Sequence, residues 1–161
     1  SRMTQQFFED VEWGDLDFLI LDLPPGTGDI QLTLVQKLAL TGAIIVTTPQ
    51  KLAILDVKKG ADMFKKVNTP VLGVIENMTH FICPNCNETT KIFPGKGGEE
   101  ESKRLDTPLL GQICFSPEMA QSTDEGIPYV LKYKNSPITI EYNKIATCIH
   151  DTLTTASSIK L

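Results

Sequence analysis

The chain has 161 residues, of which 41% are hydrophobic and 22% charged, a composition typical of one globular domain and not of a disordered chain. Its formal net charge of -5 argues against nucleic acid and an anionic membrane surface as partners. No apolar run reaches the roughly 18 residues of a membrane span, and the first residues lack a signal-peptide layout. We therefore expect a cytoplasmic protein without a membrane partner.

The first half of the chain alternates between apolar runs and helical patterns. The apolar runs at residues 17–23, 43–49 and 70–76 predict parallel strands, since such runs suit strands covered on both faces. A helix is predicted from Asp29 to Gly42. Between the second and third runs the apolar residues recur with helical spacing, at Ile54, Val57, Ala61, Phe64 and Val67. This alternation predicts an α/β fold with a mostly parallel sheet flanked by helices.

The alternation of strand and helix patterns stops at residues 77–98, a polar, turn-rich stretch that contains a Cys-x-x-Cys pair. We interpret this stretch as an inserted functional loop. After it we predict a helix beginning with "EEESKRL", a strand at 108–113, and a short helix and loop at 116–128. The last helix is predicted from a stripe of Ile138, Tyr142, Ile145, Ile149 and Leu153.

The stretch "LDLPPGTGDIQ", residues 21–31, places a carboxylate and a glycine-bearing turn after the first predicted strand. Ligands of α/β proteins bind outside the carboxyl ends of the strands. There, Asp22 could hold Mg²⁺ through water, and the backbone N–H of Gly26 could approach a γ-phosphate. The alternative interpretation is a helix-capping turn after a buried strand.

The spacing of Cys83 and Cys86 favours a metal or cluster site over a disulfide. Two thiolates supply only half of a four-coordinate shell. His80 could complete a mixed zinc site, whereas Cys114 and Cys148 are expected to be buried structural thiols. Alternatively, two copies of the "CPNC" loop meeting at a two-fold axis would supply four thiolates for one bridging [4Fe–4S] cluster.

Several motifs occur together and in order: "DFLILDLPPGTGD", "VTTPQKLAILDVKKG", "PVLGVIENM", "CPNC" and "DEGIP". In this combination the chain resembles the Mrp/ApbC-type family of P-loop ATPases, which carry iron–sulfur clusters and are related to the MinD and ParA-like ATPases. The resemblance runs from about residue 7 to residue 145.

The resemblance implies roles for individual residues. Asp22 matches the Mg²⁺-linked aspartate, and Asn77 matches the asparagine that binds the adenine edge of ATP, although by itself Asn77 would be read as a turn former. A second switch loop facing the γ-phosphate matches Pro24, Pro25, Gly26 and Thr27. The resemblance also implies a homodimer that holds a [4Fe–4S] cluster between its CPNC loops.

One family motif, a GKGGxGKS phosphate loop followed by a first switch aspartate, is not found in this sequence. The "GKGG" at 95–98 is rejected as that loop because "EEES" follows it, and we expect a turn leading into a helix instead. We therefore interpret residues 1–161 as the C-terminal portion of a single P-loop ATPase domain. ATP hydrolysis is expected of the intact family member but not of this chain alone, and a hydrophobic sheet edge is expected to lie uncovered.

The predicted function is that of an iron–sulfur cluster carrier or scaffold that binds ATP and delivers the cluster to apo iron–sulfur recipient proteins. Two alternatives remain. In the first, Cys83 and Cys86 hold structural zinc in a non-catalytic interaction module. In the second, the chain belongs to a MinD-like positioning ATPase, which would give the CPNC loop no purpose.

Overall fold

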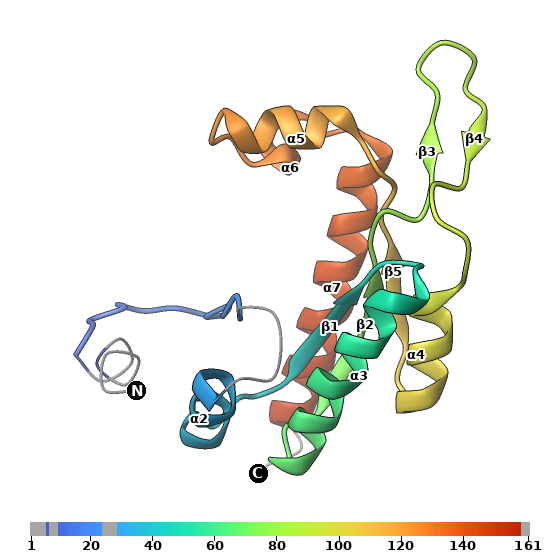
Figure 1. Ribbon diagram of the computed structural model, residues 1–161. Coiled ribbons are helices and arrows are strands. Elements are labelled where there is room, and N and C mark those ends of the chain that lie inside the picture. Colours follow the sequence, from blue (N-terminus) through green and yellow to red (C-terminus); the bar gives the residue numbers. More distant parts are fainter. Residues whose placement is uncertain (1–5, 7–9, 24–28, 159–161) are drawn as a thin grey trace.

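The computed structural model describes residue 6, residues 10–23 and residues 29–158 (Figure 1). Its centre is a three-stranded parallel sheet of order β1-β2-β5, formed by Ala43–Thr47, Val71–Glu76 and Leu109–Gln112. All three strands fall within predicted apolar runs, and the predicted α/β class with a parallel sheet is confirmed.

The two faces of the sheet carry different helices. Helices α3 (Lys51–Lys66) and α4 (Gly97–Leu105) pack on one face, and α7 (Pro137–Ser158) packs on the other, mainly against β5 (Figure 1). The first face is filled by a core that includes Ala61 and Val74. The second has a smaller core around Ile113, Ile138 and Ile145. The apolar stripes predicted for α3 and α7 thus face the sheet.

Three shorter helices complete the described chain: α2 (Asp29–Lys37), α5 (Pro117–Asp124) and α6 (Tyr129–Lys132). Helix α2 begins at the predicted residue but ends before Gly42. An added Cβ at Gly42 would lie 2.5 Å from Leu72 Cγ, so the chain passes close to β2 at that point. Within the described residues, no helix is long and apolar enough to cross a membrane.

The predicted strand at 17–23 is wrong, since residues 11–23 form neither a helix nor a strand. Several of its apolar side chains are exposed, and Ile20 is 87% accessible. The physical reason is that a strand requires a neighbour to receive its backbone hydrogen bonds. Within the described chain no strand lies beside this segment, and its contact with α7 is a ring contact between Phe18 and His150 at 5.8 Å.

One edge of the sheet is open in the described part of the chain. Strand β1 pairs with β2 on one side and with no described strand on the other. Ala43, Ile45 and Thr47 are buried under α3, while Ile44 and Val46 on the opposite face are 36% and 56% exposed. The uncovered hydrophobic edge expected from the sequence is present at β1.

Candidate functional site

The carboxyl ends of the three strands meet in register and place polar side chains together. Glu76 on the central strand is aligned with Thr47 of β1 and with Gln112 of β5. Thr47 and Glu76 are both buried, at 3% exposure each. In open α/β sheets this end of the strands is where ligands bind.

Asn77, predicted to contact adenine, follows β2 directly at this end of the sheet. Its N–H donates to the carbonyl of Thr47 at 2.7 Å, and its Oδ1 accepts from the N–H of Met78 at 2.9 Å. Met78 adopts a left-handed conformation with φ of 56°, which is uncommon for a side chain of this kind. The side chain of Asn77 accepts this hydrogen bond at the bend, and its contact with adenine stays a prediction.

The Cys-x-x-Cys pair lies in a small antiparallel hairpin of β3 (Phe81–Ile82) and β4 (Thr89–Thr90). Figure 1 shows this hairpin extending beyond the carboxyl ends of the sheet strands. Within its turn, Cys83 N–H donates to the carbonyl of Glu88 at 3.0 Å, and Asn87 N–H donates to the carbonyl of Cys83 at 2.8 Å. Cys83 is half-buried and Cys86 is exposed, and both are free thiols.

The electrostatics of the turn favour a thiolate at the first cysteine. Hydrogen bonds from the backbone of Asn85 and of Cys86, and then from the Cys86 side chain, lower the pKa of the Cys83 thiol. The thiolate is the form that binds metals and clusters. The turn therefore presents two adjacent sulfur ligands, one of them made more acidic by its surroundings.

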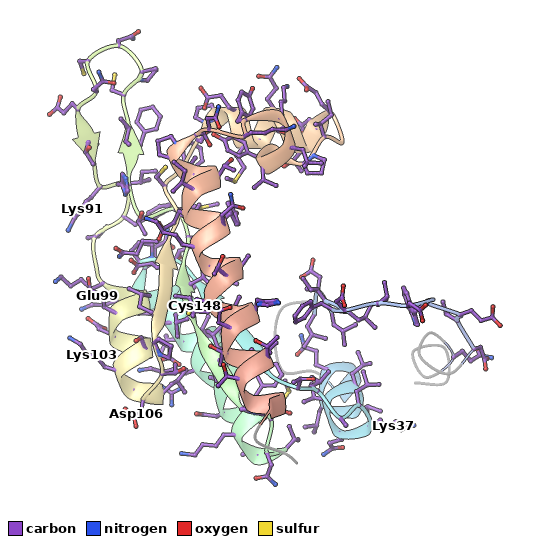
Figure 2. All side chains as sticks on the ribbon, turned by 180° about the vertical axis from the view of Figure 1, so that it is seen from behind. Lys37, Lys91, Glu99, Lys103, Asp106 and Cys148 are labelled. Carbon is purple, nitrogen blue, oxygen red and sulfur yellow. The ribbon has the colours of Figure 1, made fainter. Side chains whose placement is uncertain are left out.

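The remaining cysteines lie in other environments. Cys114 is half-buried against the α7 core, and burial raises the pKa of its thiol, in agreement with the predicted structural role. The predicted burial of Cys148 is wrong, since this side chain is exposed on α7 (Figure 2). It lines an open hollow of about 510 Å³. The prediction failed because the sheet does not extend under that side of the helix.

In the described part of the chain, no third metal ligand accompanies the hairpin cysteines. His80 is paired through Nδ1 with the hydroxyl of Thr79 at 2.8 Å. Within the described residues no group of three or more His, Cys, Asp or Glu side chains is arranged to hold a metal ion.

The Gly95–Gly98 turn leads into α4 as predicted and does not cradle a phosphate. An added Cβ at Gly95, whose φ is +121°, would lie 2.3 Å from the carbonyl oxygen of Pro49. The N–H of Gly98, in the first turn of α4, donates to Glu76 Oε1 at 2.8 Å. An internal carboxylate thus occupies the helix N-terminus, where a P-loop would hold phosphate.

The residues predicted to sense the nucleotide lie at the border of the described structure. Asp22 is exposed on an irregular segment and does not end a strand as predicted. Pro24, Pro25, Gly26 and Thr27 lie outside the described residues, so their role stays a prediction.

A protein-family model for "ParA: NUBPL iron-transfer P-loop NTPase" matches residues 1–150. The chain belongs to this NUBPL family. Among curated relatives of this NUBPL-family chain, an "Iron-sulfur cluster carrier protein" of Aquifex aeolicus is 49% identical over 90% of the chain and 40% of its own length. One of Pseudomonas fragi with the same name is 46% identical, over 91% and 51%. The "Iron-sulfur cluster transfer protein NUBPL" of Dictyostelium discoideum is 42% identical, over 88% and 44%.

Solved structures place the NUBPL-family chain among P-loop NTPases. A nucleotide-binding protein from Archaeoglobus fulgidus in complex with ADP is 40% identical, with a TM-score of 0.69 over 77% of this chain and 51% of its own. The cell division ATPase MinD of Pyrococcus furiosus is 26% identical, with a TM-score of 0.64 over 84% and 52%. The chain spans about half the length of the relatives that it matches.

Glu76 is the residue of this region whose role sequence reasoning missed. It ends the apolar run "PVLGVIE" and stands beside Asn77, which drew attention as part of "ENM". The sequence does carry a signal for this role, a carboxylate at the end of a strand in the centre of the sheet. A buried charge at such a position needs hydrogen-bond partners. The partners themselves, Gly98 and Gln112, come from segments far along the chain.

Proposed function

We propose that this chain is the cluster-holding part of an iron–sulfur cluster carrier, with Cys83 and Cys86 as the cluster ligands. The observation that carries the proposal is the projecting hairpin, in which backbone hydrogen bonds lower the pKa of the Cys83 thiol. The names of the curated relatives support the same function. The cluster is the cargo of this protein, held for transfer.

The proposed cluster is a [4Fe–4S] cluster that bridges two copies of the chain. Each hairpin offers two thiols, and a four-iron cluster takes four. A symmetric dimer supplies the other two, because a two-fold axis brings the same surface together from both subunits. The hairpin extends beyond the rest of the molecule, which leaves its turn accessible to a second copy (Figure 1).

The proposed nucleotide is ATP, bound at the carboxyl ends of the strands. Asn77 would contact the adenine edge, and the loop of Pro24, Pro25, Gly26 and Thr27 would face the γ-phosphate. The exposed carboxylate of Asp22 suits Mg²⁺, which prefers oxygen ligands and retains water; the ion would neutralise phosphate charge. The ADP complex of the Archaeoglobus fulgidus neighbour supports a nucleotide site.

In this proposal residues 1–161 are the C-terminal portion of one P-loop ATPase domain, and ATP hydrolysis belongs to the intact protein. Nucleotide binding would change how the two subunits meet, and with it the retention of the cluster. The cluster would then pass to apo iron–sulfur recipient proteins in the cytoplasm. A cluster held by two cysteines per subunit is suited to release.

Anaerobic reconstitution of the 161-residue chain with iron and sulfide tests the proposal. We expect a brown protein with about two iron atoms per chain and the mass of a dimer, since two chains share four irons. Cys83→Ser and Cys86→Ser should abolish both the colour and the cluster-dependent dimer, while the matched control Cys148→Ser retains them. A colourless protein that binds zinc through the same cysteines would instead support the interaction module.

A further inference from the structure

The hairpin leaves and rejoins the fold at two residues that are hydrogen-bonded to each other. Glu76 is the last residue of β2 before the excursion, and Gly98 lies in the first turn of α4 after it. The hydrogen bond from Gly98 N–H to Glu76 Oε1 joins residues 22 apart in sequence. It therefore closes the base of the loop that carries Cys83 and Cys86.

The outgoing stem of the loop is held to β5 and its extension by backbone hydrogen bonds. Ile113 N–H donates to the Glu76 carbonyl at 2.8 Å, and Thr79 N–H donates to the Ile113 carbonyl at 3.0 Å. Further along, Phe115 N–H donates to the His80 carbonyl at 2.7 Å. This stem is attached along its length, independently of any side chain of the loop.

The returning stem, residues 91–98, has a different attachment. Within the described part of the chain, the hydrogen bond of Gly98 to Glu76 is the one that this stem makes to another element. Its other restraint is close packing of glycines, since an added Cβ at Gly98 would lie 2.6 Å from Glu76 Cβ. Beside this packing, the side chain of Glu76 supplies the hydrogen bond that joins the returning stem to the sheet.

The second oxygen of Glu76 is also bonded, which fixes the orientation of the carboxylate. Gln112 Nε2 on β5 donates to Glu76 Oε2 at 2.7 Å, and the side chain is buried. Two donors thus converge on it from β5 and α4. A carboxylate accepts from both, whereas an alkyl side chain at this position would accept from neither.

We propose that Glu76 is a positioning residue for the cluster, a clamp that holds the returning stem of the Cys83–Cys86 hairpin against the sheet. Its side-chain hydrogen bonds go to Gly98 and Gln112 and not to the cysteines. By fixing both stems, it keeps the two sulfurs in a constant position relative to the sheet and so to the sulfurs of a second copy. The effect on the cluster rests on the proposed function, whereas the clamp itself does not.

Limited trypsin digestion of the 161-residue chain without cluster tests the clamp directly. Lys91 and Lys96 lie in the returning stem, and Figure 2 shows Lys91 projecting from the fold. Glu76→Leu, which removes the acceptor of the Gly98 N–H, should increase cleavage after these lysines by about tenfold, the effect of losing one buried hydrogen bond. Cleavage after Lys58 of α3 should rise much less.

Two variants separate the clamp from a general loss of stability. Glu76→Gln keeps an amide oxygen as the acceptor for Gly98 N–H, and its NH₂ donates to the amide oxygen of Gln112 once that amide rotates, so cleavage should stay near the wild-type rate. Glu101→Gln is the matched control, a buried glutamate of α4 bonded to Arg104. It should lower the melting temperature without selective cleavage at the stem. If Glu76→Leu does not fold, Gln112→Ala should produce a smaller selective increase.

The consequence for the cluster is measured on reconstituted protein, as the rate at which iron is lost to a chelator. We expect Glu76→Leu to lose iron several-fold faster and Glu76→Gln to match the wild type. Unchanged cleavage after Lys91 and Lys96 in Glu76→Leu would overturn the clamp, whatever the iron content. Selective cleavage with an unchanged rate of iron loss would overturn its role in cluster positioning. A wild-type chain that binds no cluster would refute the proposed function and leave the digestion result standing.

Discussion

Arg104 and Glu101, one turn apart on α4, form a bidentate ion pair in which the carboxylate is completely buried. Nε and Nη2 of Arg104 donate to Glu101 at 2.9 and 2.6 Å, and Nη1 reaches Asp62 of α3 at 2.9 Å. The hydrogen bonds to Glu101 raise the pKa of the guanidinium above its usual range. The group stays charged throughout the stable pH range, so it neutralises Glu101 permanently.

Arg104→Met should lower the free energy of unfolding by about 2–3 kcal/mol, because it leaves the buried carboxylate without its partner. The value is taken below the range for fully buried pairs because the Arg104 side chain is 32% exposed. Urea unfolding followed by circular dichroism measures it. Asp62→Asn, which alters the exposed arm of the same network, should cost no more than about 0.5 kcal/mol. Equal effects of the two substitutions would contradict this interpretation.

Two glycines should respond to alanine in opposite directions. Gly60 lies within α3 with no atom near its absent Cβ, so Gly60→Ala should stabilise by about 0.5–1 kcal/mol. At Gly97 the Cβ would lie 2.7 Å from the carbonyl oxygen of Thr48 and 2.9 Å from Ile54 Cδ1. Gly97→Ala should therefore destabilise by about 1–3 kcal/mol. Thermal unfolding of both variants checks the pair, and a stabilising Gly97→Ala would show that the α4 turn is not closely packed.

The elements that could be predicted are those whose signal is local. The apolar runs of β1, β2 and β5 and the stripe of α3 are read within one segment, and the sheet forms as expected. The run at 17–23 has the same local signal but no described neighbour, and it forms no strand. A strand is a property of a pair of segments, so its own sequence does not suffice.

The features of the candidate site likewise differ in whether a local sequence signal predicts them. Cys83 and Cys86 are close in sequence, and their spacing alone predicts them to be a pair of ligands. The hairpin around them has two pairs of bridged residues, too short for a period-two pattern to register. The bond of Glu76 to Gly98 joins distant segments, and only the fold brings them together.

The open edge of β1 should make the 161-residue chain prone to association. Unpaired backbone groups and the exposed side chains of Ile44 and Val46 provide a template for another strand. Val46→Lys should lower the apparent mass at high protein concentration in sedimentation experiments on the cluster-free chain. Leu52→Lys on α3, which alters a side chain that is 73% exposed, serves as the control and should change nothing. Equal reduction by both variants would indicate non-specific hydrophobic association.

The two half-buried thiols should titrate on opposite sides of the ordinary cysteine value. Backbone hydrogen bonds lower the pKa of Cys83, and burial raises that of Cys114. The thiolate is the reactive form, so a lowered pKa moves the rise of the alkylation rate to lower pH and a raised pKa moves it to higher pH. Mass spectrometry of iodoacetamide-treated chain at a series of pH values gives both profiles, and Cys83 should reach its plateau first.

One further variant tests which group lowers the pKa of the Cys83 thiol. Cys86→Ser exchanges the neighbouring thiol for a hydroxyl and leaves in place the backbone amides of Asn85 and residue 86, which contribute most to the lowering. The alkylation midpoint of Cys83 should therefore stay below that of Cys114. A midpoint that rises to that of Cys114 would mean that the second thiol, and not the backbone of the turn, makes Cys83 acidic. Because protons compete with iron for the same sulfur, cluster assembly should weaken as the pH falls through the Cys83 midpoint.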